Sequence, residues 1–258
     1  MRSENKKAYL SYVLAALTAL AAWYLLPMLF AGKELTLTAF YCVNALQQIF
    51  LFILPSVLIL NARKPRWEHY LSQLKRMNAE ITGAVLLGAV SCTVVASLVI
   101  SFWLPLVEAV MGYVPESVPL PDPEGAAEWI TAVLCIGVIP GIAEELFFRG
   151  VLQRALVKRF SGAGIWIAAL IFALLHLDIT SFPGLVFMGF LLGKIYQRRG
   201  LIASAAFHAL YNLIVLWINT AGADIGFLDM FLCLIAFRFA IKRLMKEDED
   251  HAADGAGV

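Results

Sequence analysis

Long stretches without a charged side chain are the feature that most limits how this chain can fold. Residues 8–30, 35–60 and 81–107 each lack Asp, Glu, Lys and Arg. A helix needs about 20 apolar residues to cross the hydrocarbon core of a membrane, and each run is that long. Hydrophobic residues are 61% of the 258 and charged residues only 15%, more apolar surface than a soluble domain of this size can bury. We therefore expect an all-α polytopic membrane protein.

The apolar runs predict about eight transmembrane helices. The expected spans are residues 8–30, 35–60, 81–107, about 129–158, 162–177, about 182–196, about 200–221 and about 225–241. The fifth and sixth are short, so we expect them to be tilted or partly re-entrant. The first run has the flanks of a signal peptide, but its 23 residues are the length of a span, and we interpret it as a retained helix.

Basic residues gather in every second loop of this arrangement. They lie before the first span and after the second, fourth, sixth and eighth: Arg2, Lys6, Lys7, Arg63, Lys64, Arg66, Lys75, Arg76, Arg154, Lys158, Arg159, Lys194, Arg198, Arg199, Lys242, Arg243 and Lys246. The loops on the other side carry only Lys33. Lys and Arg favour the cytoplasmic side, so we expect a multi-pass protein of the cell membrane with both termini cytoplasmic and residues 108–128 outside.

Most polar residues in the spans have an ordinary structural explanation. Asn44, Gln47 and Gln48 are expected to hydrogen-bond to neighbouring helices. The four cysteines stand singly in apolar runs, so we expect small buried side chains rather than disulfides or a zinc–thiolate site. Five residues whose side chains can ionise, bind a metal or form hydrogen bonds are not explained by helix packing: Glu144, Glu145, His176, His208 and Asn212.

These residues are expected at a similar depth in the membrane. Measured along each helix from its expected cytoplasmic end, Glu144 lies about 22 Å in and His176 about 20–23 Å in. His208 lies about 12 Å and Asn212 about 18 Å along the seventh span from its cytoplasmic end, near Gly200. All these positions fall within a hydrocarbon core of about 30 Å. Three separate helices therefore bring groups that can ligate or transfer protons to one layer.

Helical spacing separates the two glutamates. Glu145 and Arg149 are four residues apart, share a helix face and are expected to pair. Glu144 lies about 140° around the helix from Arg149, so its carboxylate is expected to be free for a pocket. Pro140 and Gly141, just before it, are expected to loosen the helix.

The other two helices show similar pairings. His208 and Asn212 are four residues apart and are expected to project together, and Phe172, one turn before His176, is expected to wall the same cavity. Because Glu145 is assigned to Arg149, only Asn212 and backbone carbonyls are counted as acceptors for the histidine rings.

A free carboxylate and two histidines in a partly apolar cavity suit hydrolysis in two alternative ways. Glu144, His176 and His208 could hold Zn²⁺, whose bound water becomes a nucleophile near neutral pH. Alternatively, Glu144 helped by His176 could deprotonate water directly while His208 and Asn212 stabilise the oxyanion. The spacing is not HExxH, so no zincin helix is expected. The residues alone leave both alternatives open.

Three motifs together resemble those of one protein family. EELFFR at residues 144–149 resembles the EExxxR motif of the CAAX protease and bacteriocin-processing (CPBP, or Abi) family, FALLH at 172–176 its FxxxH motif and HALYN at 208–212 its HxxxN motif. The resemblance covers about residues 125–220, and the chain is most similar to prokaryotic members. It implies a catalytic helical core, which we place at 125–243, after N-terminal transmembrane helices at 1–124; the charged composition of the tail at 244–258 predicts that it is disordered.

The resemblance implies an intramembrane endopeptidase of about eight helices. Glu144 would be the base or a metal ligand, His176, His208 and Asn212 would complete the site, and Glu145 and Arg149 would support it. Because the family is usually described as metalloproteases, the resemblance favours zinc. The substrate would be a peptide or membrane protein in contact with lipid, not nucleic acid, with roles in bacteriocin maturation, self-immunity or signalling.

Two other classes of function compete with this one. Polar groups at the membrane midplane also mark transporters and proton relays, but the sequence shows no inverted repeat, and eight spans are few for a carrier. A catalytically silent scaffold or immunity protein is the other alternative, and the intact motif set speaks against it.

Overall fold

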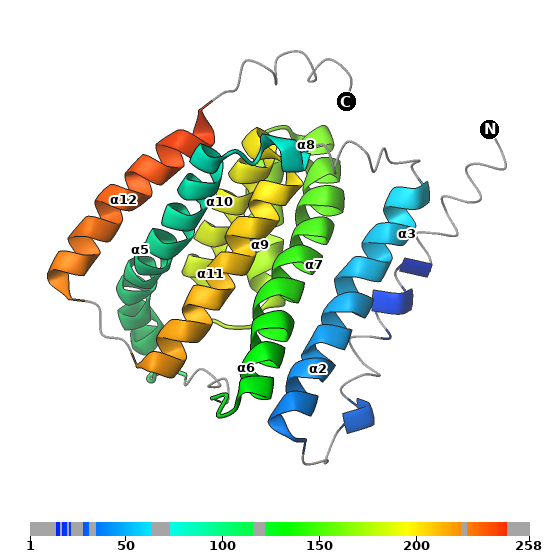
Figure 1. The fold of residues 1–258 in the computed structure, drawn as a ribbon, viewed down its shortest axis with the longest axis horizontal. Coiled ribbons are helices and arrows are strands. Elements are labelled where there is room, and N and C mark those ends of the chain that lie inside the picture. The colour runs from blue at the N-terminus through cyan, green and yellow to red at the C-terminus, as the bar shows by residue number, and fades with distance from the viewer. Residues whose placement is uncertain are drawn as a thin grey trace.

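The computed structural model describes residues 14–15, 17–19, 21, 28–30, 35–62, 73–115, 122–222 and 226–246. These residues form helices and the connections between them, with no strand in the described ranges, which confirms the all-α expectation (Figure 1). Most of the first predicted span, and the tail from residue 247 onward, lie outside the described residues. The elements are α2 (Leu37–Gln48), η1 (Ile49–Ile53), α3 (Leu54–Ala62), η2 (Gln73–Arg76), α5 (Ala79–Met111), α6 (Ala126–Ala132), η3 (Val133–Val138), α7 (Ile139–Phe147), η4 (Phe148–Gln153), α8 (Arg154–Phe160), α9 (Ala163–Leu175), α10 (Phe182–Arg199), α11 (Leu201–Ala221) and α12 (Phe227–Met245).

Four continuous helices in the described ranges are long and apolar enough to cross a membrane. They are Leu37–Asn61, Ala79–Met111, Ala126–Phe160 and Leu201–Ala221. The predicted fifth span is the shorter apolar helix α9. Helices α10 and α12 have 18 and 19 residues but carry more charged side chains near their ends. The protein is thus a multi-pass membrane protein, while the count of eight spans stays a prediction.

The helix ends that carry basic clusters meet at one end of the bundle. The C-terminal ends of α8 and α12 lie at the top of Figure 1. There the Arg199 guanidinium donates to three backbone carbonyls at the end of α12. The Gln73 side chain accepts from the backbone N–H of Leu201 at 2.7 Å, which joins η2 to the start of α11. This arrangement agrees with alternating loops, although the orientation in the membrane stays a prediction.

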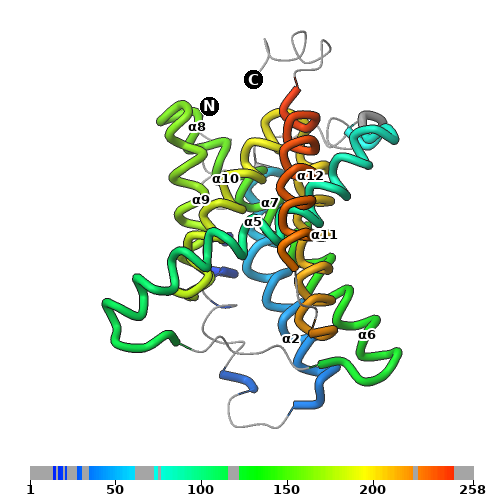
Figure 2. The backbone as a smooth tube through the Cα atoms, turned by 90° about the vertical axis from the view of Figure 1, so that its left-hand side faces the viewer, coloured from blue at the N-terminus to red at the C-terminus, as the bar shows by residue number. Residues whose placement is uncertain are grey.

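Helix α5 runs obliquely across the bundle (Figure 2). Asn78 caps its start, where the side chain accepts from the backbone N–H of Ile81 at 2.9 Å, and Gly112 caps its end with a left-handed φ of 79°. Its N-terminal half shares a buried core with α10, α11 and α12, in which Cys92 and Phe207 are fully enclosed. The predicted boundary at residue 124 therefore crosses one continuous apolar core, and it stays a prediction as a division of the chain.

Helix α7 and the preceding η3 cross α11 at very close range, because two glycines four residues apart face it. A Cβ atom on Gly141 would lie 2.6 Å from the backbone nitrogen of Ala209, and one on Gly137 would collide with Leu213. Small residues allow helix backbones in membranes to approach in this way. The π-helical segment η3, which is wider than an α-helix, ends just before Pro140, and Pro140 lacks a backbone N–H donor. The helix is therefore irregular just before Glu144, where the sequence predicts that it is loosened. The crossing brings the next turn of α7 against His208.

Candidate active site

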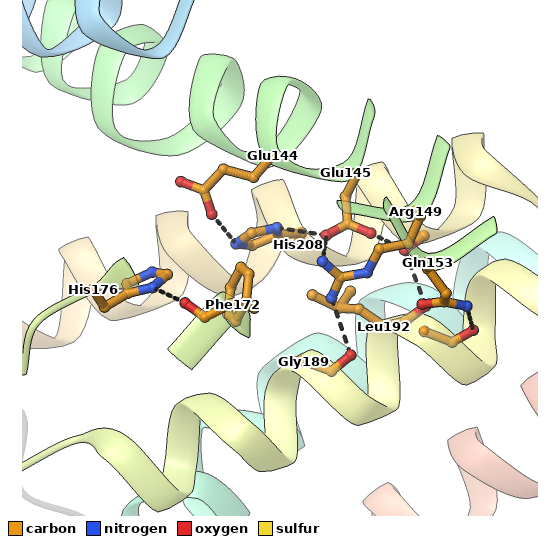
Figure 3. A network of polar contacts seen from close by, with 11 residues as sticks. Glu144, Glu145, Arg149, Gln153, Phe172, His176, Gly189, Leu192 and His208 are labelled. Carbon is orange, nitrogen blue, oxygen red and sulfur yellow. Dashed lines mark hydrogen bonds and ion pairs between the residues drawn. The ribbon is translucent and has the colours of Figure 1, made fainter. Parts of the chain in front are cut away.

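Glu145 is the centre of a buried polar network (Figure 3). Its side chain is fully enclosed. Oε1 lies 3.1 Å from Nη1 of Arg149 and 3.0 Å from Nδ1 of His208, and Oε2 accepts from the hydroxyl of Ser204. The expected pairing with Arg149 is present. The expectation that this pairing excludes the histidines is wrong, because one carboxylate oxygen serves both partners.

The long side chains of η4 reach across to glycine carbonyls of α10. Arg149 donates from Nη2 to the carbonyl of Gly189 at 3.1 Å, and Gln153 donates to the carbonyl of Gly193 at 3.0 Å. The guanidinium also lies over the ring of Phe172, 5.1 Å from its centroid, within the range of a cation–π contact. Arg149 is thus buried together with its counter-charge, a carbonyl acceptor and an aromatic face.

Glu144 faces away from Arg149, as the helical spacing predicts. Its side chain is buried, and Oε1 accepts a hydrogen bond from Nε2 of Gln48 at 3.0 Å. Oε2 has no hydrogen-bond partner and lies 3.9 Å from Nε2 of His208. A buried carboxylate oxygen that receives no hydrogen bond from the protein is uncommon.

The partners of His208 assign its protons. A carboxylate only accepts, so Nδ1 carries the hydrogen that is donated to Glu145. In the neutral ring, Nε2 is then an acceptor, and it faces Oε2 of Glu144, which is also an acceptor. At 3.9 Å these atoms are beyond hydrogen-bond distance. A small donor placed between them would satisfy both.

A cavity of about 270 Å³ lies beside Glu144, between α2, η3, α7 and α11. Its polar lining comes from α2 and from the predicted site, and its apolar lining from η3, α7 and α11: Asn44, Gln48, Glu144, Asn212, Cys135, Ile136, Pro140, Val215 and Leu216. Of the predicted residues, Glu144 and Asn212 line this cavity. The cavity therefore connects the free carboxylate with a side-chain amide one turn beyond His208.

His176 lies at the end of α9 and does not line the cavity beside Glu144. Helix α9 ends at Leu175, so His176 sits at the helix end, exposed, with Nδ1 2.8 Å from the carbonyl of Phe172. The Phe172 ring lies 4.6 Å from the His176 ring and 5.8 Å from the His208 ring, and it stands between them in Figure 3. The backbone carbonyl expected as a partner is found, but Phe172 separates the histidines rather than lining the cavity with them.

The three predicted metal ligands are not grouped as a metal centre. Throughout the described ranges, no three His, Cys, Asp or Glu side chains lie close enough together to hold a metal ion. Glu144 and His208 face each other, but the Phe172 ring stands between His208 and His176. A catalytic zinc site normally uses three protein ligands, so the side chains as placed do not fit one.

Two residues of the site were not singled out from the sequence as members of it. Gln48 does bond to a neighbouring helix, as expected, but its partner is the predicted base Glu144. Ser204 precedes His208 by four residues, and its hydroxyl contacts the carboxylate that holds His208. A search for polar residues one turn from each histidine would have found Ser204. Nothing in the local sequence links Gln48 to Glu144.

Residues 126–214 match a family model described as Type II CAAX prenyl endopeptidase Rce1-like. The matched segment contains all three motifs and each of the predicted site residues, but it does not include α2 with Gln48. No curated protein and no solved structure matches the chain.

Proposed function

We propose that the chain, whose residues 126–214 match the model of the Rce1-like CAAX prenyl endopeptidases, is an intramembrane endopeptidase and cleaves peptide bonds with a water molecule activated by Glu144 and His208. The observation that carries the proposal is the pair of acceptors, Oε2 of Glu144 and Nε2 of His208, which face each other without a donor. A water molecule has two hydrogens to donate and would meet the needs of both.

The proposed first step is proton transfer from this water to Glu144. As its O–H bond breaks, the water oxygen bonds to the carbonyl carbon of the scissile peptide, and negative charge develops on the carbonyl oxygen. The amide of Asn212, which lines the same cavity, offers N–H groups to that oxygen. Glu144 then passes the proton to the peptide nitrogen as the C–N bond breaks, which releases an amine and a carboxylic acid.

The Glu145 network has a positioning role in this proposal. Glu145 fixes the Nδ1–H tautomer of His208, so that Nε2 is the nitrogen presented to water. Arg149 supplies the opposite charge, which matters because an unpaired carboxylate would be costly in a buried position. Ser204 holds the second oxygen of Glu145 and limits the rotation of the carboxylate.

We assign His176 to the substrate side rather than to the water-activating pair. Its Nδ1–H is donated to the Phe172 carbonyl, so Nε2 is the nitrogen left to accept a hydrogen bond. The ring is exposed, unlike that of His208. In this assignment it contacts a substrate that approaches past Phe172. The substrate is a peptide or membrane protein within the cell membrane.

A comparison of membranes that contain the wild-type protein or Glu144→Gln tests the proposed function. We expect new peptide termini that are present with the wild type and absent with the variant at equal protein levels. Identical termini in both preparations would contradict the proposal and favour the alternatives of a silent scaffold or a transporter. Transport of a polar solute by Glu144→Gln vesicles would then distinguish those two.

A further inference from the structure

We propose that Gln48, on α2, is a positioning residue that turns the Glu144 carboxylate toward His208 for reaction. The proposal rests on the proposed function of Glu144. It assigns a role in the site to a helix that lies outside the segment matched by the family model. Catalytic competence would then depend on α2 as well as on the motif-bearing helices.

The contact between the two side chains defines the orientation of both. Nε2 of Gln48 lies 3.0 Å from Oε1 of Glu144, although the residues are 96 positions apart in the chain. A carboxylate accepts and cannot donate when ionised, so the amide must present its NH₂ group and not its oxygen. With Oε1 engaged in this way, Oε2 is the oxygen that faces His208.

The unused half of the Gln48 amide indicates that the donor is what this position requires. Its carbonyl oxygen Oε1 is buried and has no hydrogen-bond partner. Burying an unsatisfied carbonyl is unfavourable, so a position needed only for helix packing would be better filled by Met or Leu. Gln48 also lines the cavity together with Glu144 and Asn212.

Helix α2 is held firmly enough to serve this purpose. Tyr41 and Ala45 are buried against Ala132, Cys135 and Leu216. These contacts lie one and two turns before Gln48 on the same helix. They place the amide donor relative to η3 and α11, the elements that form the rest of the cavity wall.

Steady-state kinetics of Gln48→Met test the proposal, because Met keeps the length of the side chain and removes the donor. We expect kcat to fall about 10- to 100-fold, as for other residues that orient a reactive group, with KM changed less than about twofold. The matched control is Gln47→Met, a half-buried neighbour that does not line the cavity. Unchanged kcat in Gln48→Met, or an equal loss in both variants, overturns the proposal.

An infrared measurement provides a second test that does not depend on proteolysis. In each background, the spectrum of the protein with Glu144 minus the spectrum of the same protein with Glu144→Gln isolates the Glu144 carboxylate bands. We expect these bands to shift in the Gln48→Met background and to stay in place in the Gln47→Met background. Unshifted bands in the Gln48→Met background overturn the proposal, even if that variant has lost activity. Where Glu144→Gln cleaves as well as the wild type, the proposed function fails, and a band shift would then show that Gln48 orients a carboxylate with no part in the reaction.

Discussion

The carboxylate of Glu145 lies 3.0 Å from Nδ1 of His208, across 63 positions of the chain. The neighbouring residue, Glu144, faces the other nitrogen of the same ring at 3.9 Å. The two adjacent glutamates thus face different nitrogens of one imidazole, and only Glu145 also pairs with Arg149. In the proposed mechanism, this difference in surroundings makes Glu145 the residue that positions the ring and Glu144 the residue that reacts through its unpartnered Oε2.

Glu144→Gln should abolish cleavage without loss of folded protein. The amide cannot take a proton from water, and a general base of this kind contributes about 10²–10⁴-fold to kcat. The measurement is turnover of an identified substrate by purified protein at matched yield. Glu108→Gln, an exposed position near the end of α5, is the control and should be fully active. Full turnover by Glu144→Gln would show that another group activates the water.

Arg149→Met and Glu145→Gln should each destabilise the protein by about 3–5 kcal/mol, because each strands a charge in a buried site. The double variant should be less unstable than the sum of the two. Unfolding in detergent micelles gives the free energies. Glu80→Gln breaks a pair with Arg243 in which the glutamate is 59% exposed, and it should cost less than about 1 kcal/mol. Equal losses from the buried and the exposed pair would contradict the account of Glu145.

Chelator treatment decides between the two ways of activating water. In the proposed mechanism a chelated preparation without stoichiometric metal keeps its turnover. His208→Ala loses activity through kcat, and His176→Ala mainly raises KM. The zinc alternative predicts about one zinc per chain, lost together with activity in both histidine variants. Elemental analysis of the same fully active preparation, before and after chelation, supplies the answer.

Gly141→Ala should separate α7 from α11. The added methyl group would stand 2.6 Å from the backbone nitrogen of Ala209, which cannot move aside as a side chain can. We expect a loss of about 1–3 kcal/mol in stability and reduced turnover. Gly83→Ala, where nothing lies within 4 Å, is the matched control and should be neutral or stabilising. A stable, active Gly141→Ala protein would indicate that the two helices have room to separate.

Asp178 should make the turn after His176 sensitive to acid. Burial alone would raise the pKa of Asp178, but hydrogen bonds from Thr180 and Ser181 to its carboxylate lower the pKa overall. Because the pKa of Asp178 is lower in the folded than in the unfolded protein, the ionised carboxylate stabilises the fold at pH values above its unfolded-state pKa. This stabilisation is lost as the pH falls through the folded-state pKa, below about pH 4. Asp178→Asn should therefore be less stable than the wild type at pH 7, and the difference should shrink in acid. The free energies of unfolding of both proteins at pH 7 and in acid measure this difference. A difference that does not change with pH would contradict a lowered pKa of Asp178.

The sequence predicts the helices well because charge-free runs report the membrane directly. The expected fourth span, about 129–158, is found as Ala126–Phe160, and the third as Ala79–Met111. The pair Glu145–Arg149 is equally predictable, since spacing within one helix determines it.

Relations between helices are harder to predict. His176 was placed by its depth in the helix, but α9 ends beside it, with Leu177 at a left-handed φ of 53°, and the Phe172 ring lies between the two histidines. Gln48 meets Glu144 only because α2 packs against η3 and α7 in one register. No local pattern encodes such a register, because it depends on how side chains of distant segments fit together.

The pairing of Glu145 with Arg149 inside one helix has a consequence for biosynthesis. During insertion, the helix Ala126–Phe160 leaves the ribosome before α10 and α11 have been made. An isolated carboxylate would enter lipid at a cost of several kcal/mol, whereas this one brings its own cation one turn away. We therefore expect the helix to integrate on its own, and His208 to find its hydrogen-bond acceptor already in place when the later helix arrives.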